Sequence, residues 1–302
     1  MIFRCIAYFA IALPALISCD RKITPTALKK KIVSRLEKQK GTFAVAFKDL
    51  STGEELLIND HELFHAASTM KVPVMIEAFK LVADGKISLT DSILIKNEFK
   101  SIVDNGPYRL KTKDDSEFDL YKIVGQKRPL SELIYKMITA SSNLATNILI
   151  EQVGADQTTQ TMRELGAMDI LVLRGVEDSL AHAHKLDNTV TAYDLMLIFE
   201  KMANGEVVSQ EASRAMIAIL LDQKFNTIIP ARLPTGARVA HKTGWFKGLH
   251  HDAGIVFLAD GKKYVLVILS RGLEDEDSAV KAMARVSATL YKYVNHSHAK
   301  WP

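Results

Sequence analysis

The spacing of hydrophobic residues predicts strands near both ends of the chain and helices in between. Leu28, Ile32 and Leu36 recur every fourth residue, as on the buried face of an amphipathic helix. Short continuous apolar runs predict buried strands instead. In chain order the predicted elements are a helix at 27–40, strands at 42–47 and 56–58, a helix at 68–83, helices within 130–165 that break near Ser141 and Gly154, helices at 191–203 and 209–221, strands at 238–242, 253–258 and 264–270, and a helix at 274–294.

This order of elements predicts an α/β fold. Because strands occur at both ends of the chain, we expect one five-stranded antiparallel sheet flanked by helices, with an all-helical region inserted into it. The α/β part is expected at about 27–67 and 213–302, and the helical part at about 68–212. Two segments lack a clear period: 97–129 is expected to be a polar surface excursion, and 169–190 a long loop.

Charge is concentrated at the N-terminus. The 302 residues have a formal net charge of +4, but residues 1–40 contain nine basic and two acidic side chains. That segment therefore carries +7 and residues 41–302 carry −3. A nucleic-acid-binding domain needs a basic face to neutralise phosphates, so we do not expect nucleic acid as a partner of the body.

The N-terminal residues predict export. Residues 5–18 are apolar but too few to span a bilayer, which is typical of a signal peptide. Leu16-Ile17-Ser18-Cys19 resembles a bacterial lipobox, in which residues 1–18 are removed and Cys19 is lipidated, leaving 19–26 as a linker. We expect a periplasmic, membrane-anchored lipoprotein. A soluble periplasmic protein is the alternative, and a monomer is the default state.

Ser68 and Lys71 form the first motif that carries chemistry. Ser68 lies at the start of a predicted helix, where free N–H groups favour a developing oxyanion. Lys71 lies three residues later on the same helix face, so its amine can reach the Ser68 hydroxyl. A lysine acts as a base only if burial or a nearby cation, such as Lys242, lowers its pKa. Alone, the motif is equally typical of a capped helix.

Two further motifs follow in the chain. Ser141-Ser142-Asn143 lies between predicted helices and presents a hydroxyl and an amide. Lys242-Thr243-Gly244 follows a predicted strand and offers a cation and a hydroxyl to an anionic group, with a glycine that permits close approach of a ligand. A helix cap and a strand end are the ordinary interpretations of each motif. The order of the three motifs along the chain, and the distances between them, indicate a catalytic site more strongly than any one motif does.

With these motifs the chain resembles the penicillin-recognising serine hydrolases, most closely class A β-lactamases, over residues 25–295. The resemblance implies a β-lactamase/transpeptidase-like fold and a serine acyl-enzyme, with no cofactor and no metal. The implied roles are Ser68 as nucleophile, Lys71 in proton transfer, Ser141 as proton relay to the leaving nitrogen, Asn143 on the substrate amide, Lys242 and Thr243 on the substrate carboxylate, and the backbone N–H groups of Ser68 and Trp245 as oxyanion hole. The Trp245 ring could stack on a ligand or pack in the interior.

The family also has a loop glutamate that activates water for deacylation. Glu177 is the candidate here, with Asp178 in reserve. Arg174 is expected to clasp the loop through a carboxylate at its far end, such as Asp187.

The chain departs from the family pattern at three points. Ser142 stands where the family usually has Asp, and the spacing from Arg174 to Glu177 is one residue longer than usual. Ala181 stands where the family has an Asn that helps to hold the hydrolytic water. The sequence therefore supports acylation by a β-lactam more than it supports rapid deacylation. This leaves a D-alanyl-D-alanine peptidase, acting on peptidoglycan-like peptides, as the alternative function, and a lipid-anchored binding protein without turnover as a further one.

Several histidines could suggest a metal. Residues 61–65, His-Glu-Leu-Phe-His, match a zinc-peptidase motif that requires a helix, but they follow the turn-forming Asn59-Asp60. We therefore expect no zinc site here, and expect Phe64 to be buried. His182, His184, His250 and His251 lack a third ligand at diagnostic spacing and are expected to be solvated or buried in the core.

Overall fold

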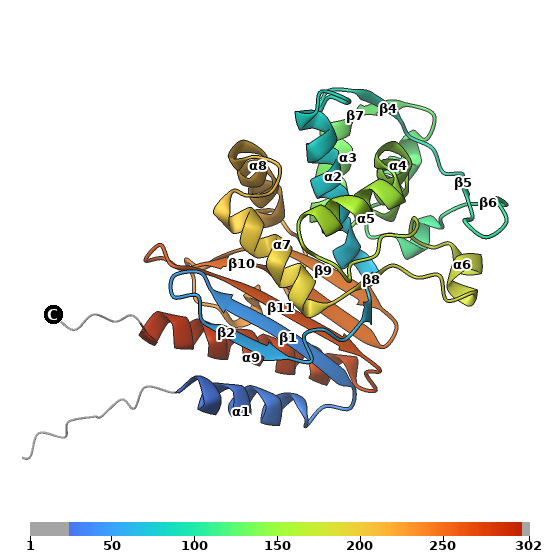
Figure 1. The fold of residues 1–302 in the computed structure, drawn as a ribbon. Coiled ribbons are helices and arrows are strands. Elements are labelled where there is room, and N and C mark those ends of the chain that lie inside the picture. Colours follow the sequence, from blue (N-terminus) through green and yellow to red (C-terminus); the bar gives the residue numbers. More distant parts are fainter. Residues whose placement is uncertain (1–23, 298–302) are drawn as a thin grey trace, which may run out of the picture.

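The computed structural model describes residues 24–297 and contains a five-stranded antiparallel sheet with helices on both faces (Figure 1). The strand order is β2-β1-β11-β10-β9, so strands from both ends of the chain share one sheet, as predicted. The strands are β1 (Thr42–Asp49), β2 (Glu55–Ile58), β9 (Arg238–Phe246), β10 (Leu249–Phe257) and β11 (Lys263–Arg271).

The sheet is buried on both faces, which explains its continuous apolar runs. In β1, Phe43, Val45 and Phe47 belong to the core cluster that the N- and C-terminal helices cover. Ala44 and Ala46, which alternate with them, belong to the larger cluster that includes the helical region. The alternation follows from the two-residue period of a strand.

Two helices lie against one face of the sheet and the remaining helices lie on the other side (Figure 1). α1 (Pro25–Leu36) and α9 (Glu276–Ser297) form the first group. The others are α2 (Lys71–Ala83), α3 (Leu130–Thr139), α4 (Asn143–Val153), α5 (Ala155–Glu164), α6 (Ser179–Ala183), α7 (Ala192–Asn204) and α8 (Gln210–Leu221). The predicted helices are confirmed, although the first ends at Leu36 rather than at Lys40.

Most residues of the segment 97–129 are exposed, so the predicted surface excursion is confirmed, but the segment is more ordered than expected. It contains β5 (Phe99–Lys100) paired with β6 (Pro107–Tyr108), two 3-10 turns, η2 (Thr112–Asp114) and η3 (Leu120–Ile123), and β7 (Lys127–Pro129), which pairs with β4 (Ser92–Leu94) just before the segment. Phe99, Leu110 and Leu120 join the main core. Asp115 and Glu117 are only 4% and 6% exposed. Their buried carboxylates are stabilised by hydrogen bonds that they accept from backbone N–H groups.

The segment 169–190 is a loop that contains only α6 and the short strand β8 (Thr189–Val190). β8 pairs with β3 (Phe64–His65), so the zinc-peptidase motif is not helical, as expected, and Phe64 is buried. No helix within residues 24–297 is long and apolar enough to cross a membrane. The predicted signal peptide, Cys19 and most of the linker lie outside the described residues.

Gly254 provides a test of the sheet register. A Cβ at this position would overlap the Ala240 carbonyl oxygen and lie 2.5 Å from the His241 Cβ. We expect Gly254→Ala to cost about 1–3 kcal/mol of stability through overpacking. Thermal unfolding followed by circular dichroism should show a melting temperature several degrees lower. An unchanged melting temperature would contradict the pairing of Gly254 with His241.

Candidate active site

Ser68 lies at the start of a continuous helical segment. The predicted helix at 68–83 consists of a 3-10 turn, η1 (Ala67–Met70), followed directly by α2. Ala67 has φ +44°, in the left-handed region that residues other than glycine rarely adopt. This conformation occurs where the chain passes from β3 into η1, and Ser68 is left half-buried rather than enclosed.

The Lys71 amine is buried and held by the α3–α4 turn. Its Nζ donates to the Ser141 carbonyl oxygen (2.7 Å), the Ser141 Oγ (3.2 Å) and the Asn143 Oδ1 (2.8 Å). Burial lowers the pKa of Lys71 to about 7, against the opposing effect of the Asp115 and Glu177 carboxylates. The predicted contact is not formed, since no hydrogen bond within residues 24–297 joins this amine to the Ser68 hydroxyl. The amine is held beside Ser141 instead.

Lys242 approaches the same serine from β9. Its Nζ donates to the Ser141 Oγ (3.0 Å) and to the Thr243 carbonyl oxygen (2.8 Å). Burial, together with the neighbouring Lys71 cation, holds the pKa of Lys242 well below its usual range. The Ser141 hydroxyl therefore lies between two buried amines, so Lys242 is close to Lys71 as expected, but burial is the cause that lowers the pKa of Lys71.

Gly244 allows β9 to run against η1. A Cβ on Gly244 would lie 3.2 Å from the Ala67 Cβ and 3.3 Å from the Ser68 backbone nitrogen. The glycine therefore permits a close approach of two backbones, a reason that the sequence alone did not indicate. The next residue, Trp245, is 65% exposed and its indole donates to Glu276 (3.2 Å), so packing in the interior is excluded.

Asn143 connects Lys71 to Glu177. It is the first residue of α4, and its side chain accepts from Lys71 and donates through Nδ2 to the Glu177 Oε1 (2.7 Å). The preceding Ser142 caps α4 by accepting from the Ala145 N–H (3.2 Å). Ser142 therefore serves the helix terminus, while Asn143 faces the site.

Glu177 and Asp178 have different surroundings. Glu177 has φ +61°, and burial raises the pKa of its carboxyl despite the Asn143 hydrogen bond. The Asp178 carboxylate caps α6 through the Ala181 N–H (3.0 Å) and accepts from Ser101 Oγ (3.0 Å) and the Ile102 N–H (3.1 Å). Glu177 is therefore the carboxylate at the site. Asp178 instead holds the loop to the 97–129 segment.

The loop is held at two points. Arg174 pairs with Asp187 at 2.6 Å, as predicted. Asn147, which the sequence analysis missed, clasps Val176 by accepting from its N–H (2.7 Å) and donating to its carbonyl oxygen (3.0 Å). Asn147 follows Asn143 by one helical turn, so helical spacing was a signal that could have identified it.

Asp115 is a second residue that the sequence analysis missed. Its Oδ2 accepts from the backbone N–H groups of Asn143 (2.9 Å) and Leu144 (3.0 Å) and from the Tyr121 hydroxyl (2.9 Å). The carboxylate thus stabilises the N-terminus of α4, where Asn143 must be positioned. No periodicity in the polar 97–129 segment indicated this contact.

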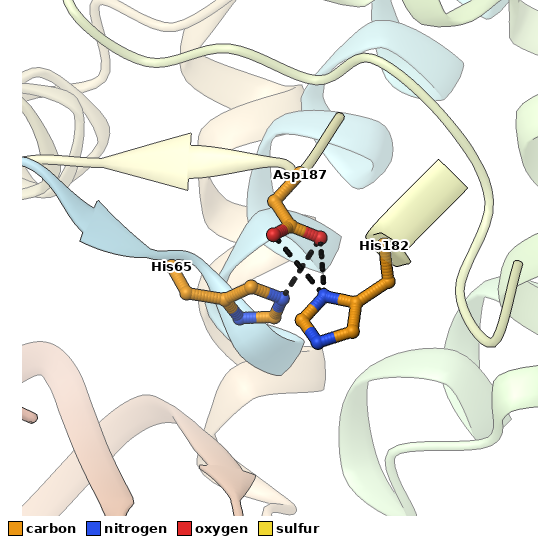
Figure 2. Close-up of side chains that lie close together, drawn as sticks. All are labelled: His65, His182 and Asp187. Carbon is orange, nitrogen blue, oxygen red and sulfur yellow. Dashed lines mark hydrogen bonds and ion pairs between the residues drawn. The ribbon is translucent and has the colours of Figure 1, made fainter. Parts of the chain in front are cut away.

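Three side chains near the loop base resemble a metal site (Figure 2). His182 Nδ1 lies 2.9 Å from Asp187 Oδ1, and His65 Nε2 lies 3.6 Å from the same oxygen. However, the Ala67 N–H donates to His65 Nδ1 (3.0 Å), which puts the proton of a neutral His65 on Nε2. That nitrogen has no lone pair for a metal in this tautomer, and Arg174 already neutralises Asp187. The cluster is therefore best described as hydrogen-bonded support for the loop.

Comparisons with known proteins agree on one family. A profile of the β-lactamase enzyme family matches residues 27–294. A β-lactamase of Bacteroides uniformis is 26% identical, over 94% of this chain and 98% of its own length. The crystal structure of a β-lactamase from Sphaerobacter thermophilus has 26% identity and a TM-score of 0.76, covering 88% of this chain and 97% of that one. An acyl-enzyme complex of a PBP-A variant with penicillin G has 26% identity and a TM-score of 0.76, covering 89% and 97%.

The Asn147 clasp can be tested by Asn147→Ala. We expect faster amide hydrogen exchange at residues 174–178, because two hydrogen bonds to the Val176 backbone are lost. Asn97→Ala is the matched control, since Asn97 clasps Leu110 through the same two kinds of bond (3.0 and 2.9 Å) in another segment. Equal exchange at 174–178 in both variants would contradict this role of Asn147.

Proposed function

This chain belongs to the β-lactamase enzyme family, and we propose from that premise that it is a serine β-lactamase of the class A type. The observation that carries the proposal is the convergence of Lys71 and Lys242 on the Ser141 hydroxyl, with Glu177 joined to the same network through Asn143. A nucleophile, a base, a proton relay and a water-activating carboxylate are what a serine acyl-enzyme cycle needs.

Acylation uses the neutral form of Lys71. Its amine takes the Ser68 hydroxyl proton as Oγ attacks the β-lactam carbonyl carbon, either directly or after a shift from its position at Ser141. The backbone N–H groups of Ser68 and Trp245 stabilise the oxyanion of the tetrahedral intermediate. The Ser141 hydroxyl then delivers a proton to the ring nitrogen as the C–N bond breaks, and regains one from a neighbouring lysine.

Substrate binding involves the Lys242 side of the site. Burial and the neighbouring Lys71 disfavour the Lys242 cation in the free protein, where its Nζ contacts the Ser141 Oγ and the Thr243 carbonyl oxygen. The carboxylate of a β-lactam stabilises that cation, with a hydrogen bond from Thr243. Asn143 binds the side-chain amide of the substrate, and the exposed Trp245 ring offers a surface for its acyl group.

Deacylation depends on Glu177. Its carboxylate takes a proton from a water that attacks the acyl carbon, which releases the product and restores Ser68. The raised pKa of Glu177 makes it a stronger base than an exposed glutamate once it is ionised. Ala181, which is buried, has no polar group to help hold that water.

The absence of a polar group at Ala181 favours one alternative function. This is a D-alanyl-D-alanine peptidase or related cell-wall hydrolase that β-lactams acylate but that releases them slowly. The similarity to PBP-A in its penicillin G acyl-enzyme supports the acylation step common to both functions. We further propose that the protein is exported, is anchored at a lipidated Cys19 and acts as a monomer.

Ser68→Ala and Glu177→Gln separate the two halves of the cycle. Ser68→Ala should give no covalent labelling by a fluorescent penicillin, because the nucleophile is gone. Glu177→Gln should be labelled and then retain the label, because its amide cannot accept the proton of water. Labelling by gel fluorescence and turnover of a chromogenic cephalosporin are the measurements. Normal turnover by Glu177→Gln would show that another group activates the water.

Asp115→Asn tests the electrostatic part of the mechanism. The Asp115 carboxylate raises the pKa of both Lys71 and Glu177, so its removal should lower both. The free amine and the carboxylate then persist to lower pH, and the acid limbs of acylation and deacylation should both shift to lower pH. Glu117→Gln is the control, because this buried carboxylate pairs with Lys136 instead (2.7 Å). If neither limb moves in Asp115→Asn, Asp115 acts only as a helix cap.

A further inference from the structure

Two helices on one face of the sheet carry cations and almost no acid. α1 has no acidic residue, and α9 has acids only in its first turn. The cations on the two helices are Lys29, Lys30, Lys31 and Arg35 of α1 and Lys281, Arg285 and Lys292 of α9. We call these seven residues the basic face. It lies far in the chain from the catalytic motifs and has no part in the mechanism above.

The structure brings the two helices together as one surface. α1 and α9 lie side by side across the same face of the sheet (Figure 1). The Arg35 guanidinium donates to the Arg285 carbonyl oxygen (3.2 Å) and to the Thr289 Oγ1 (3.1 Å), which places two like charges on adjacent helices. Lys281, Arg285 and Lys292 are exposed at spacings of four and seven residues, so they form one stripe along α9.

None of the seven side chains forms an ion pair within residues 24–297. Elsewhere on the surface, pairing is common: Lys40 binds Glu274, Lys48 binds Glu55 and Glu200, and Lys96 binds Glu151. Like charges that gather without forming ion pairs repel one another and attract an anionic partner. Because the face is formed by two neighbouring helices on the outside of the sheet, it suits an extended anionic surface better than a small ligand.

We propose that the basic face rests on an anionic phospholipid surface. The sequence favours this partner over other polyanions because α1 follows the apolar run at 5–18 and Cys19. The six residues 19–24 reach at most about 20 Å when fully extended. An anchor at Cys19 therefore keeps α1 near the lipid headgroups, where each Lys or Arg adds attraction to an acyl anchor.

This orientation would leave the catalytic side accessible. α2 and the helical region lie on the opposite side of the sheet from α1 and α9 (Figure 1). With the basic face on the lipid, the helical region that begins at η1, the turn that contains Ser68, would lie on the side away from the membrane, so substrate could enter from the aqueous side.

The test uses a chain that begins at Asp20, without the apolar run. Both hydrophobic cores are formed by residues 28–294, so this chain retains the whole fold. Co-sedimentation with vesicles of phosphatidylcholine alone is compared with vesicles containing about one third phosphatidylglycerol. We expect at least about tenfold stronger partitioning into the anionic vesicles at low salt, and loss of that preference at high salt, because the attraction is screened.

A charge-reversal variant assigns the effect to this face. Lys281→Glu/Arg285→Glu/Lys292→Glu should abolish the preference for anionic vesicles. The matched control, Lys100→Glu/Lys127→Glu/Lys224→Glu, makes the same change of charge at exposed lysines of other segments and should keep it. The proposal is overturned if the protein partitions equally into both vesicles, if the control loses as much binding, or if duplex DNA is bound as strongly as the anionic vesicles. Cephalosporin turnover, which all variants should retain, tests the enzymatic function separately.

Discussion

The proposed catalytic arrangement depends on two buried amines that share one hydroxyl. Lys71 comes from the helical region and Lys242 from the edge strand of the sheet, and both donate to the Ser141 Oγ. Burying two ammonium groups side by side is costly, so at least one gives up its proton near neutral pH. The same burial that would destabilise two cations lowers the pKa of Lys71 to about 7, as the proposed base requires. The position of the inserted helical region against the sheet therefore sets the chemistry as well as the shape.

Negative charge on the other side of Lys71 balances this arrangement. Asp115 and Glu177 both raise the pKa of Lys71, and Asn143 bridges Lys71 to Glu177. Asp115 also fixes the helix terminus that carries Asn143. Asp115, from a segment outside the recognised motifs, thus acts on the helix terminus and on Lys71 and Glu177, the two groups to which we assign proton transfer. The loop that presents Glu177 is held separately, by Asn147 and by the Arg174–Asp187 pair.

The strong patterns in the sequence were sufficient for the fold and for the main motifs. The sheet was predicted from the apolar runs of β1, β10 and β11, and α1 from its four-residue spacing of apolar side chains. Both patterns arise because an element that buries one or both faces has apolar residues at the positions on those faces. The motif residues Lys71, Ser141, Asn143, Lys242 and Glu177 are brought together. Asp115 could not be predicted, because a buried carboxylate whose partners are backbone N–H groups leaves no periodic trace. The position of the Lys71 amine could not be predicted either, because it depends on packing between helices that are distant in sequence.

Burial should leave the Lys71 amine able to accept a proton near neutral pH. An NMR titration of the protein with 13C-labelled lysine side chains tests this, and Lys71→Arg identifies the Lys71 signal. We expect a midpoint at about pH 7 for that signal. A midpoint near pH 10, as in an exposed lysine, would show that Lys71 stays charged and cannot accept the serine proton.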